Sequence, residues 1–87
     1  MSTHNKINVA VIGATGYTGL DLTLMLSRHP KVKIVNLCAT KNLGKKISYF
    51  DKRIKKDLPK ISSIKKVNWM KLDLVFLSLP NGGAQKL

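Results

Sequence analysis

Three glycines spaced three residues apart stand between an apolar run and a stretch with helical periodicity. The apolar run is Ile7–Ile12, the glycines are Gly13, Gly16 and Gly19, and the periodic stretch is Tyr17–Arg28. A near-continuous run of branched apolar residues is typical of a buried parallel strand. The order strand, glycine loop, helix is the context in which such glycines bind a dinucleotide, although the spacing differs from the commoner G-x-G-x-x-G.

Each glycine has its own expected task in this loop. Gly13 allows a tight turn out of the strand, Gly16 leaves room for a pyrophosphate, and Gly19 lets the helix pack closely. The helix N-terminus offers unpaired N–H groups to an anion, and the two threonines add hydroxyl donors. The candidate cofactor-binding residues of this loop are Gly13, Thr15, Gly16, Tyr17, Thr18 and Gly19.

Two later apolar stretches predict further strands. Val32–Cys38 follows the helix, and Asp73–Leu79 is the clearest strand in the second half of the chain. Strand, helix and strand of this length indicate a βαβ unit. We therefore expect an α/β fold: an incomplete Rossmann-type domain in which a parallel sheet is built from these strands and Ile7–Ile12 and is flanked by helices.

The segment between these strands is harder to interpret. Ala39–Lys46 has the composition of a polar loop, and Ile47–Lys60 has a rough helical spacing that its lysines and Pro59 interrupt. Ile61–Val67 could form a short strand. We expect Trp69 and Met70 to anchor a turn onto the core.

The residues that follow the second strand indicate which cofactor is bound. Sites for NAD usually place an acidic residue there, whereas this chain has Thr40 and Lys41, with Lys45 and Lys46 further on. A cationic loop suits a 2′-phosphate, which favours NADP. The alternative is an ordinary exposed basic loop.

A second candidate contact lies at the end of the Asp73–Leu79 strand. Ligands of open α/β sheets bind at the carboxyl edge, so this loop could pack against the nicotinamide side of the cofactor. The alternative is a plain strand-to-helix turn. The candidate residues are Leu79, Pro80, Asn81 and Gly82.

Charge and composition keep one different function class open. The chain has 87 residues and a net charge of +12, with sixteen Lys and Arg against four acidic residues, all aspartate. This balance also fits a free-standing basic module that binds nucleotides or nucleic acid. The lysines are dispersed, however, and no basic helix alternates with stacking aromatic residues. A solvated lysine-rich surface is therefore the favoured interpretation, with no nucleic-acid partner.

No catalytic residue can be assigned within the sequence. The single cysteine, Cys38, closes a predicted strand without an assignable base, and is expected to be a buried structural thiol. His29 is expected to be a helix-terminal cation. There are no paired carboxylates and no cluster of residues with metal-ligand spacing. No apolar run approaches membrane-spanning length and no targeting core is present, which favours a cytoplasmic protein without a membrane partner.

Several of these motifs resemble one enzyme family. Val11–Leu22 and Leu26–Val32 are similar to the start of N-acetyl-gamma-glutamyl-phosphate reductases. Gly44–Ser48 resembles that family's Gly-Lys segment, and Asp73–Gly82 resembles the next motif of the family, a strand that ends in a Leu-Pro-x-Gly loop. The glycine run alone would also suit an aspartate-semialdehyde dehydrogenase. The chain departs from the reductase pattern at Asp21, where glutamate is common, and at Asn81, where histidine is frequent.

The resemblance implies an activity that this segment would serve only in part. Enzymes of the family reduce an acyl phosphate, N-acetyl-gamma-glutamyl phosphate, to a semialdehyde with NADPH in arginine biosynthesis. Their catalytic cysteine and histidine belong to a substrate domain further along the chain. We therefore expect residues 1–87 to be the N-terminal part of an NAD(P)-binding domain, without the catalytic domain and inactive alone. The full-length enzyme would be a homo-oligomer.

Overall fold

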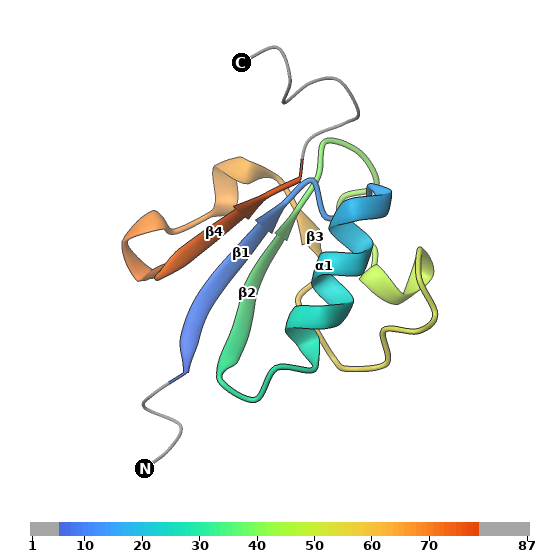
Figure 1. Ribbon diagram of the computed structural model, residues 1–87. Helices are drawn as coiled ribbons and strands as arrows, with labels where there is room; N and C mark the ends of the chain where they lie inside the picture. The colour runs from blue at the N-terminus through green and yellow to red at the C-terminus, as the bar shows by residue number, and fades with distance from the viewer. Residues whose placement is uncertain (1–5, 79–87) are drawn as a thin grey trace.

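The computed structural model describes residues 6–78 and contains one four-stranded parallel sheet (Figure 1). Its strands stand in the order β3-β2-β1-β4. The main elements are β1 (Ile7–Ile12), α1 (Tyr17–Ser27), β2 (Val32–Cys38), β3 (Ile61–Ser62) and β4 (Leu74–Leu77). Single turns of 3-10 helix lie at Ile47–Tyr49, Ile64–Lys66 and Trp69–Lys71.

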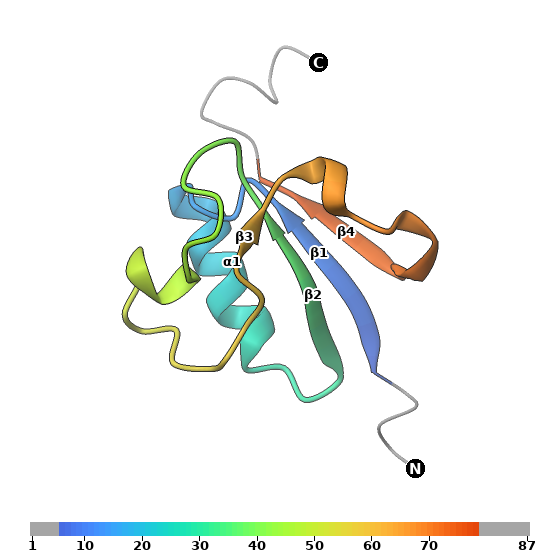
Figure 2. The same cartoon turned by 180° about the vertical axis from the view of Figure 1, so that it is seen from behind.

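The sheet confirms the predicted parallel arrangement. Strand β1 pairs in parallel with β2 on one side and with β4 on the other, and β2 also pairs with β3. Helix α1 connects β1 to β2 and covers one face of the sheet (Figure 1). Strands β3 and β4 form the two outer strands of the sheet, and the connection between them crosses the face opposite α1. Figure 2 shows this face. All four strands consequently end at one carboxyl edge.

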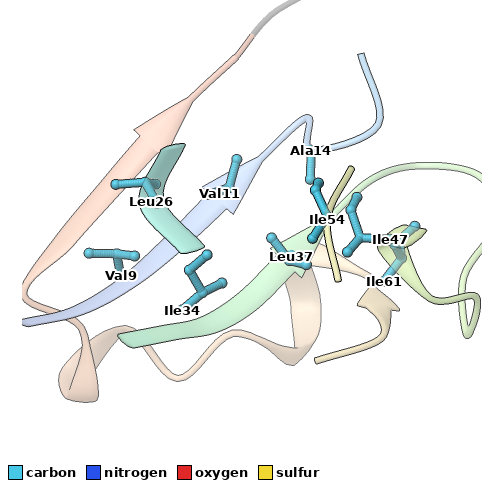
Figure 3. Packing of buried hydrophobic residues seen from close by; sticks show 9 residues of the cluster. All are labelled: Val9, Val11, Ala14, Leu26, Ile34, Leu37, Ile47, Ile54 and Ile61. Atoms are coloured by element: carbon cyan, nitrogen blue, oxygen red, sulfur yellow. The ribbon is translucent and has the colours of Figure 1, made fainter. Parts of the chain in front are cut away.

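The core lies between this sheet, α1 and the irregular segment after β2. Figure 3 shows the side chains of this cluster, including Val9 and Val11 of β1 beside Leu26 of α1. On β2 the register shifts by one residue between Ile34 and Asn36, so Ile34 and Leu37 both join the cluster. A bulge of this kind brings residues three apart onto one face, which simple alternation would not.

Helix α1 matches the predicted helix except at its last residue and on one part of its face. Arg28 is the cap that follows the helix rather than part of it. The apolar side chain of Met25 does not join the core, because 63% of its surface is exposed. Thr23 is fully buried instead, because its hydroxyl donates to the Gly19 carbonyl at 2.7 Å and so leaves no unpaired polar atom.

The segment 47–60 contains one short 3-10 helix and is otherwise irregular. It is held in place by two buried side chains, Ile47 and Ile54. Arg53 adds polar links: it pairs with Asp51 at 2.6 Å and with Asp21 of α1 at 2.8 Å. The helical spacing seen in the sequence therefore reflects separate buried residues, Ile47 and Ile54, and not a long helix.

Three expectations for the second half of the chain need correction. Trp69 and Met70 do not anchor a turn onto the core, since their exposed fractions are 51% and 95%. The strand predicted for Ile61–Val67 is limited to Ile61–Ser62, and a 3-10 turn follows because Ser63 caps it by accepting from the Lys65 N–H. Strand β4 begins at Leu74 rather than Asp73.

Within residues 6–78, no helix is both long enough and apolar enough to cross a membrane.

Candidate nucleotide-binding site

The glycine loop leaves β1 through a turn that only glycine accommodates easily. Gly13 has a φ of +80°, in the left-handed region, and a Cβ atom there would overlap the carbonyl oxygen of Ser78 after β4. The backbone N–H groups of Gly13 and Ala14 both donate to the Cys38 carbonyl, at 2.8 and 3.0 Å. The loop is thereby fixed between the carboxyl ends of β2 and β4.

Gly19 brings the first turn of α1 against this same loop. An added Cβ would overlap the carbonyl oxygen of Gly13 and would lie 2.9 Å from the Cα of Ala14. Ala14 itself is fully buried. The predicted close approach at Gly19 is confirmed, and its contact is the glycine loop rather than the middle of the strand.

Gly16 differs from Gly13 and Gly19 because the space beside its Cα is open. Its φ of −75° and ψ of 168° are ordinary extended values that any residue can adopt. Apart from its two chain neighbours, the described residues place one heavy atom within 4 Å of an added Cβ, which is the Gly13 carbonyl oxygen at 3.7 Å. No backbone requirement for glycine exists here, and a side chain would fill space that the loop leaves free. This is the arrangement expected where a pyrophosphate approaches the backbone.

The N-terminus of α1 provides donors beside this open position. Gly16 is the N-cap, and no side chain caps the helix within the described residues. The first N–H groups of a helix have no partner within the helix, and the positive end of the dipole lies there. Tyr17 and Thr18 are exposed, and Thr15 is half-buried. Backbone donors, a dipole and a glycine opening together fit a bound phosphate group.

The loop that follows β2 lies beside the glycine loop at the carboxyl edge, as both views show (Figures 1 and 2). It is pinned to β3, because the Gly44 N–H donates to the Ile61 carbonyl at 2.7 Å and the Ile61 N–H donates to the Lys45 carbonyl at 2.9 Å. Gly44 has a φ of +88°. Thr40 and Lys41 are exposed on this pinned loop.

The other two lysines of this loop have different surroundings. The Lys45 ammonium lies 4.6 Å from the centre of the Tyr49 ring, a cation–π geometry. Lys46 lines a separate hollow formed by residues 46–58. Among the basic residues predicted for this loop, Lys41 thus follows the strand end most directly.

Cys38 is confirmed as a buried thiol. Its exposed fraction is 1%, and desolvation by burial raises its pKa, while a hydrogen bond with the Ser62 side chain acts in the opposite direction. A raised pKa disfavours the thiolate that a nucleophile requires. The loop Leu79–Gly82, predicted as a further cofactor contact, lies outside the described residues.

Sequence reasoning missed two features of this site. The Cys38 carbonyl accepts both amides of the glycine turn, although only its thiol drew attention in the sequence. The carbonyl oxygen of Ser78, which follows β4, lies so close to Gly13 that a side chain at position 13 would overlap it. The parallel pairing predicted for these strands could have indicated the second contact, because it brings the end of β4 beside the end of β1.

Comparison with known proteins agrees with this geometry. The family model described as the NAD-binding domain of semialdehyde dehydrogenase matches residues 8–87. Among curated relatives, N-acetyl-gamma-glutamyl-phosphate reductases from Rhodospirillum rubrum and Ehrlichia ruminantium (strain Gardel) are 41% and 40% identical. Each alignment covers 94% of this chain and 24% of the relative, so the chain spans about a quarter of their length.

A solved structure shows the same fold. The crystal structure of aspartate semialdehyde dehydrogenase with NADP from Candida albicans matches with a TM-score of 0.69 and 28% sequence identity. The match covers 92% of this chain and 25% of that one. The predicted Rossmann-type fold is confirmed, and the chain belongs to the family of NAD-binding domains of semialdehyde dehydrogenases.

Proposed function

We propose that this chain is the NADP-binding part of an N-acetyl-gamma-glutamyl-phosphate reductase. The observation that carries the proposal is the open position at Gly16 beside an uncapped helix N-terminus. Gly13 and Gly19 have steric reasons to be glycine, whereas the reason at Gly16 is the space above it. The relatives at 40–43% identity that carry the reductase name support the enzyme assignment.

The cofactor would be held by backbone groups and by few side chains. The pyrophosphate would accept from the first N–H groups of α1, with Thr15 and Thr18 hydroxyls as additional donors. The 2′-phosphate would lie at Thr40 and Lys41, in a loop whose sequence contains no acidic residue. The loop Leu79–Gly82 is proposed as the contact on the nicotinamide side. When bound, NADPH would supply the hydride, and these residues would bind and orient the cofactor.

The acyl-phosphate reduction itself is proposed for the longer protein that the relatives represent. A reaction of this class needs a nucleophile for the acyl carbon, and Cys38 is buried with a raised pKa. We therefore expect the 87-residue chain alone to turn over no N-acetyl-gamma-glutamyl phosphate. A homo-oligomer, a cytoplasmic location and the lack of a nucleic-acid partner stay predictions.

A chimaeric enzyme would test the cofactor role. This chain would replace the equivalent quarter of the Rhodospirillum rubrum reductase, to which it is 41% identical. The chimaera should bind NADPH in calorimetric titration, and Gly16→Val in the chimaera should abolish that binding while the fold is retained. Unchanged NADPH affinity in the Gly16→Val chimaera would refute the site.

A second candidate function is that of an aspartate semialdehyde dehydrogenase, which the structural match to the Candida albicans enzyme favours. The two enzymes differ in the acyl phosphate that they reduce and not in the cofactor chemistry. Reading the coding DNA beyond Leu87 and assaying the encoded product with both acyl phosphates would separate them. Turnover of aspartyl phosphate alone would reject the first proposal.

A further inference from the structure

A concave surface is formed by residues that lie outside the glycine loop. It is an open hollow of about 600 Å³ formed within residues 46–58, and among residues 6–78 none of the candidate cofactor-binding residues lines it. Four lysines and one aspartate contribute to its lining: Lys46, Lys52, Lys55, Lys56 and Asp57. Ile54, which is 1% exposed, anchors the segment from beneath. The hollow is therefore strongly cationic and has a fixed base.

Two aspartates outside the lining form ion pairs with an arginine rather than with these lysines. Asp51 and Asp21 are both engaged by Arg53, through contacts of 2.6 and 2.8 Å. Within residues 6–78, the ion pairs formed are those of Arg53, so none involves a lysine of the hollow. Asp57 is the one acidic residue of the lining, against four cations. A concave surface with such an excess of one charge concentrates the potential and attracts counter-ions.

Other contacts keep the segment in one conformation. The Asp51 N–H donates to the Ile47 carbonyl at 3.2 Å, and the Ile54 N–H donates to the Asp51 carbonyl at 3.1 Å. The Lys56 ammonium donates to the Ser27 carbonyl at 3.1 Å and so ties the hollow to the end of α1. The three remaining lysines project from a backbone that is already ordered, which reduces the entropy lost when they bind a common anion.

We propose that this hollow binds a small polyanion that carries two or more phosphate groups, at a site separate from the glycine loop. Linked phosphates offer more negative charge and more acceptor oxygens to the lysines of the lining than a single phosphate does. Lysine suits such a ligand because each ammonium acts as a point charge with three donors.

Inorganic pyrophosphate is the probe for the test, with the 87-residue chain labelled with ¹⁵N. Titration should shift the amide signals of residues 46–58, and the signals of Gly16 and Thr18 would report any binding at the glycine loop. The test variant is Lys52→Gln with Lys55→Gln. The matched control is Lys65→Gln with Lys66→Gln, which removes the same charge from the 3-10 turn after β3, outside the lining.

We expect the test pair to weaken pyrophosphate binding at residues 46–58 by about tenfold or more, as loss of a charge-assisted hydrogen bond implies. The control pair should change it by less than about twofold, because distant exposed charges are screened. Gly16→Val should leave these shifts intact, which separates this site from the proposed cofactor role. Equal weakening by both pairs, shifts confined to the glycine loop, or no binding at millimolar pyrophosphate would each overturn the proposal.

Discussion

The Cα of Gly19 lies so close to the carbonyl oxygen of Gly13 that no side chain fits between them. A Cβ added to Gly19 would overlap that oxygen and would also lie 2.9 Å from the Cα of Ala14. All of these neighbours are backbone atoms, which cannot rotate away as a flexible side chain would. The contact joins the first turn of α1 to the loop that leaves β1.

We expect Gly19→Ala to destabilise the fold. Alanine would gain up to about 1 kcal/mol over glycine in helix propensity. The overlap with fixed backbone atoms should outweigh this gain and leave a net loss of about 1–3 kcal/mol in the free energy of unfolding. Urea denaturation followed by circular dichroism measures the difference. A variant as stable as the wild type would contradict the packing described for this turn.

Gly16→Ser should separate stability from nucleotide binding. Serine is a preferred N-cap residue, and the backbone of Gly16 already has the extended conformation of a cap. We therefore expect the free energy of unfolding to stay equal or rise slightly, while NADPH affinity in the chimaeric reductase falls because the side chain enters the open space. Unfolding curves and calorimetric titration of the same variant provide both readouts. A serine variant with full affinity would show that no ligand group needs this space.

The strands and the glycine loop could be predicted because their signals are local. A run of branched residues such as Ile7–Ile12 is recognisable whatever lies around it, and the tight turn at Gly13 and the close approach at Gly19 are those that the glycine loop predicted. The bulge in β2 could not be predicted, because alternation within Val32–Cys38 does not show which residue lacks a partner on β1. That register depends on the neighbouring strand.

The second half of the chain was less predictable because its order rests on long-range contacts. Ile54 is buried at the base of an irregular segment, where the sequence offered only a rough helical spacing. Trp69 was expected to anchor a turn because its side chain is large and apolar, but 51% of it is exposed. The Arg53 pairs and the cationic hollow also depend on how this segment folds back on α1, which no motif encodes.

The Asp51 carboxylate should make stability depend on pH in the acid range. The hydrogen bond from the Arg53 side chain lowers the pKa of Asp51 below its ordinary value of 3.8. The unfolded chain therefore binds the proton more readily, so this contribution is fully present above about pH 4 and is lost as the pH falls through the lowered pKa. Urea denaturation from about pH 5 to pH 2 should show a shallower loss of stability for Asp51→Asn than for the wild type.

Asp57→Asn is the control for this experiment, because Asp57 forms no ion pair within residues 6–78. It removes the same formal charge from the same irregular segment. If Asp51→Asn and Asp57→Asn have equal effects on the pH dependence, the Arg53 contact does not cause it.

Lys41 should determine the preference for NADPH over NADH. It follows β2 on a loop pinned to β3, while the Lys45 ammonium faces the Tyr49 ring and Lys46 lines the cationic hollow. A charge-assisted hydrogen bond to the 2′-phosphate is worth about 1.5–3 kcal/mol, or roughly tenfold to a hundredfold in affinity. In the chimaeric reductase, Lys41→Asp should weaken NADPH binding by at least that factor and leave NADH binding nearly unchanged.

The control is Lys71→Asp, which makes the identical charge change. Lys71 lies just before β4, at the amino end of the strands and so opposite the carboxyl edge. Calorimetric titration with both cofactors decides the matter: if Lys41→Asp weakens both equally, or if Lys71→Asp has the same effect, Lys41 does not recognise the 2′-phosphate.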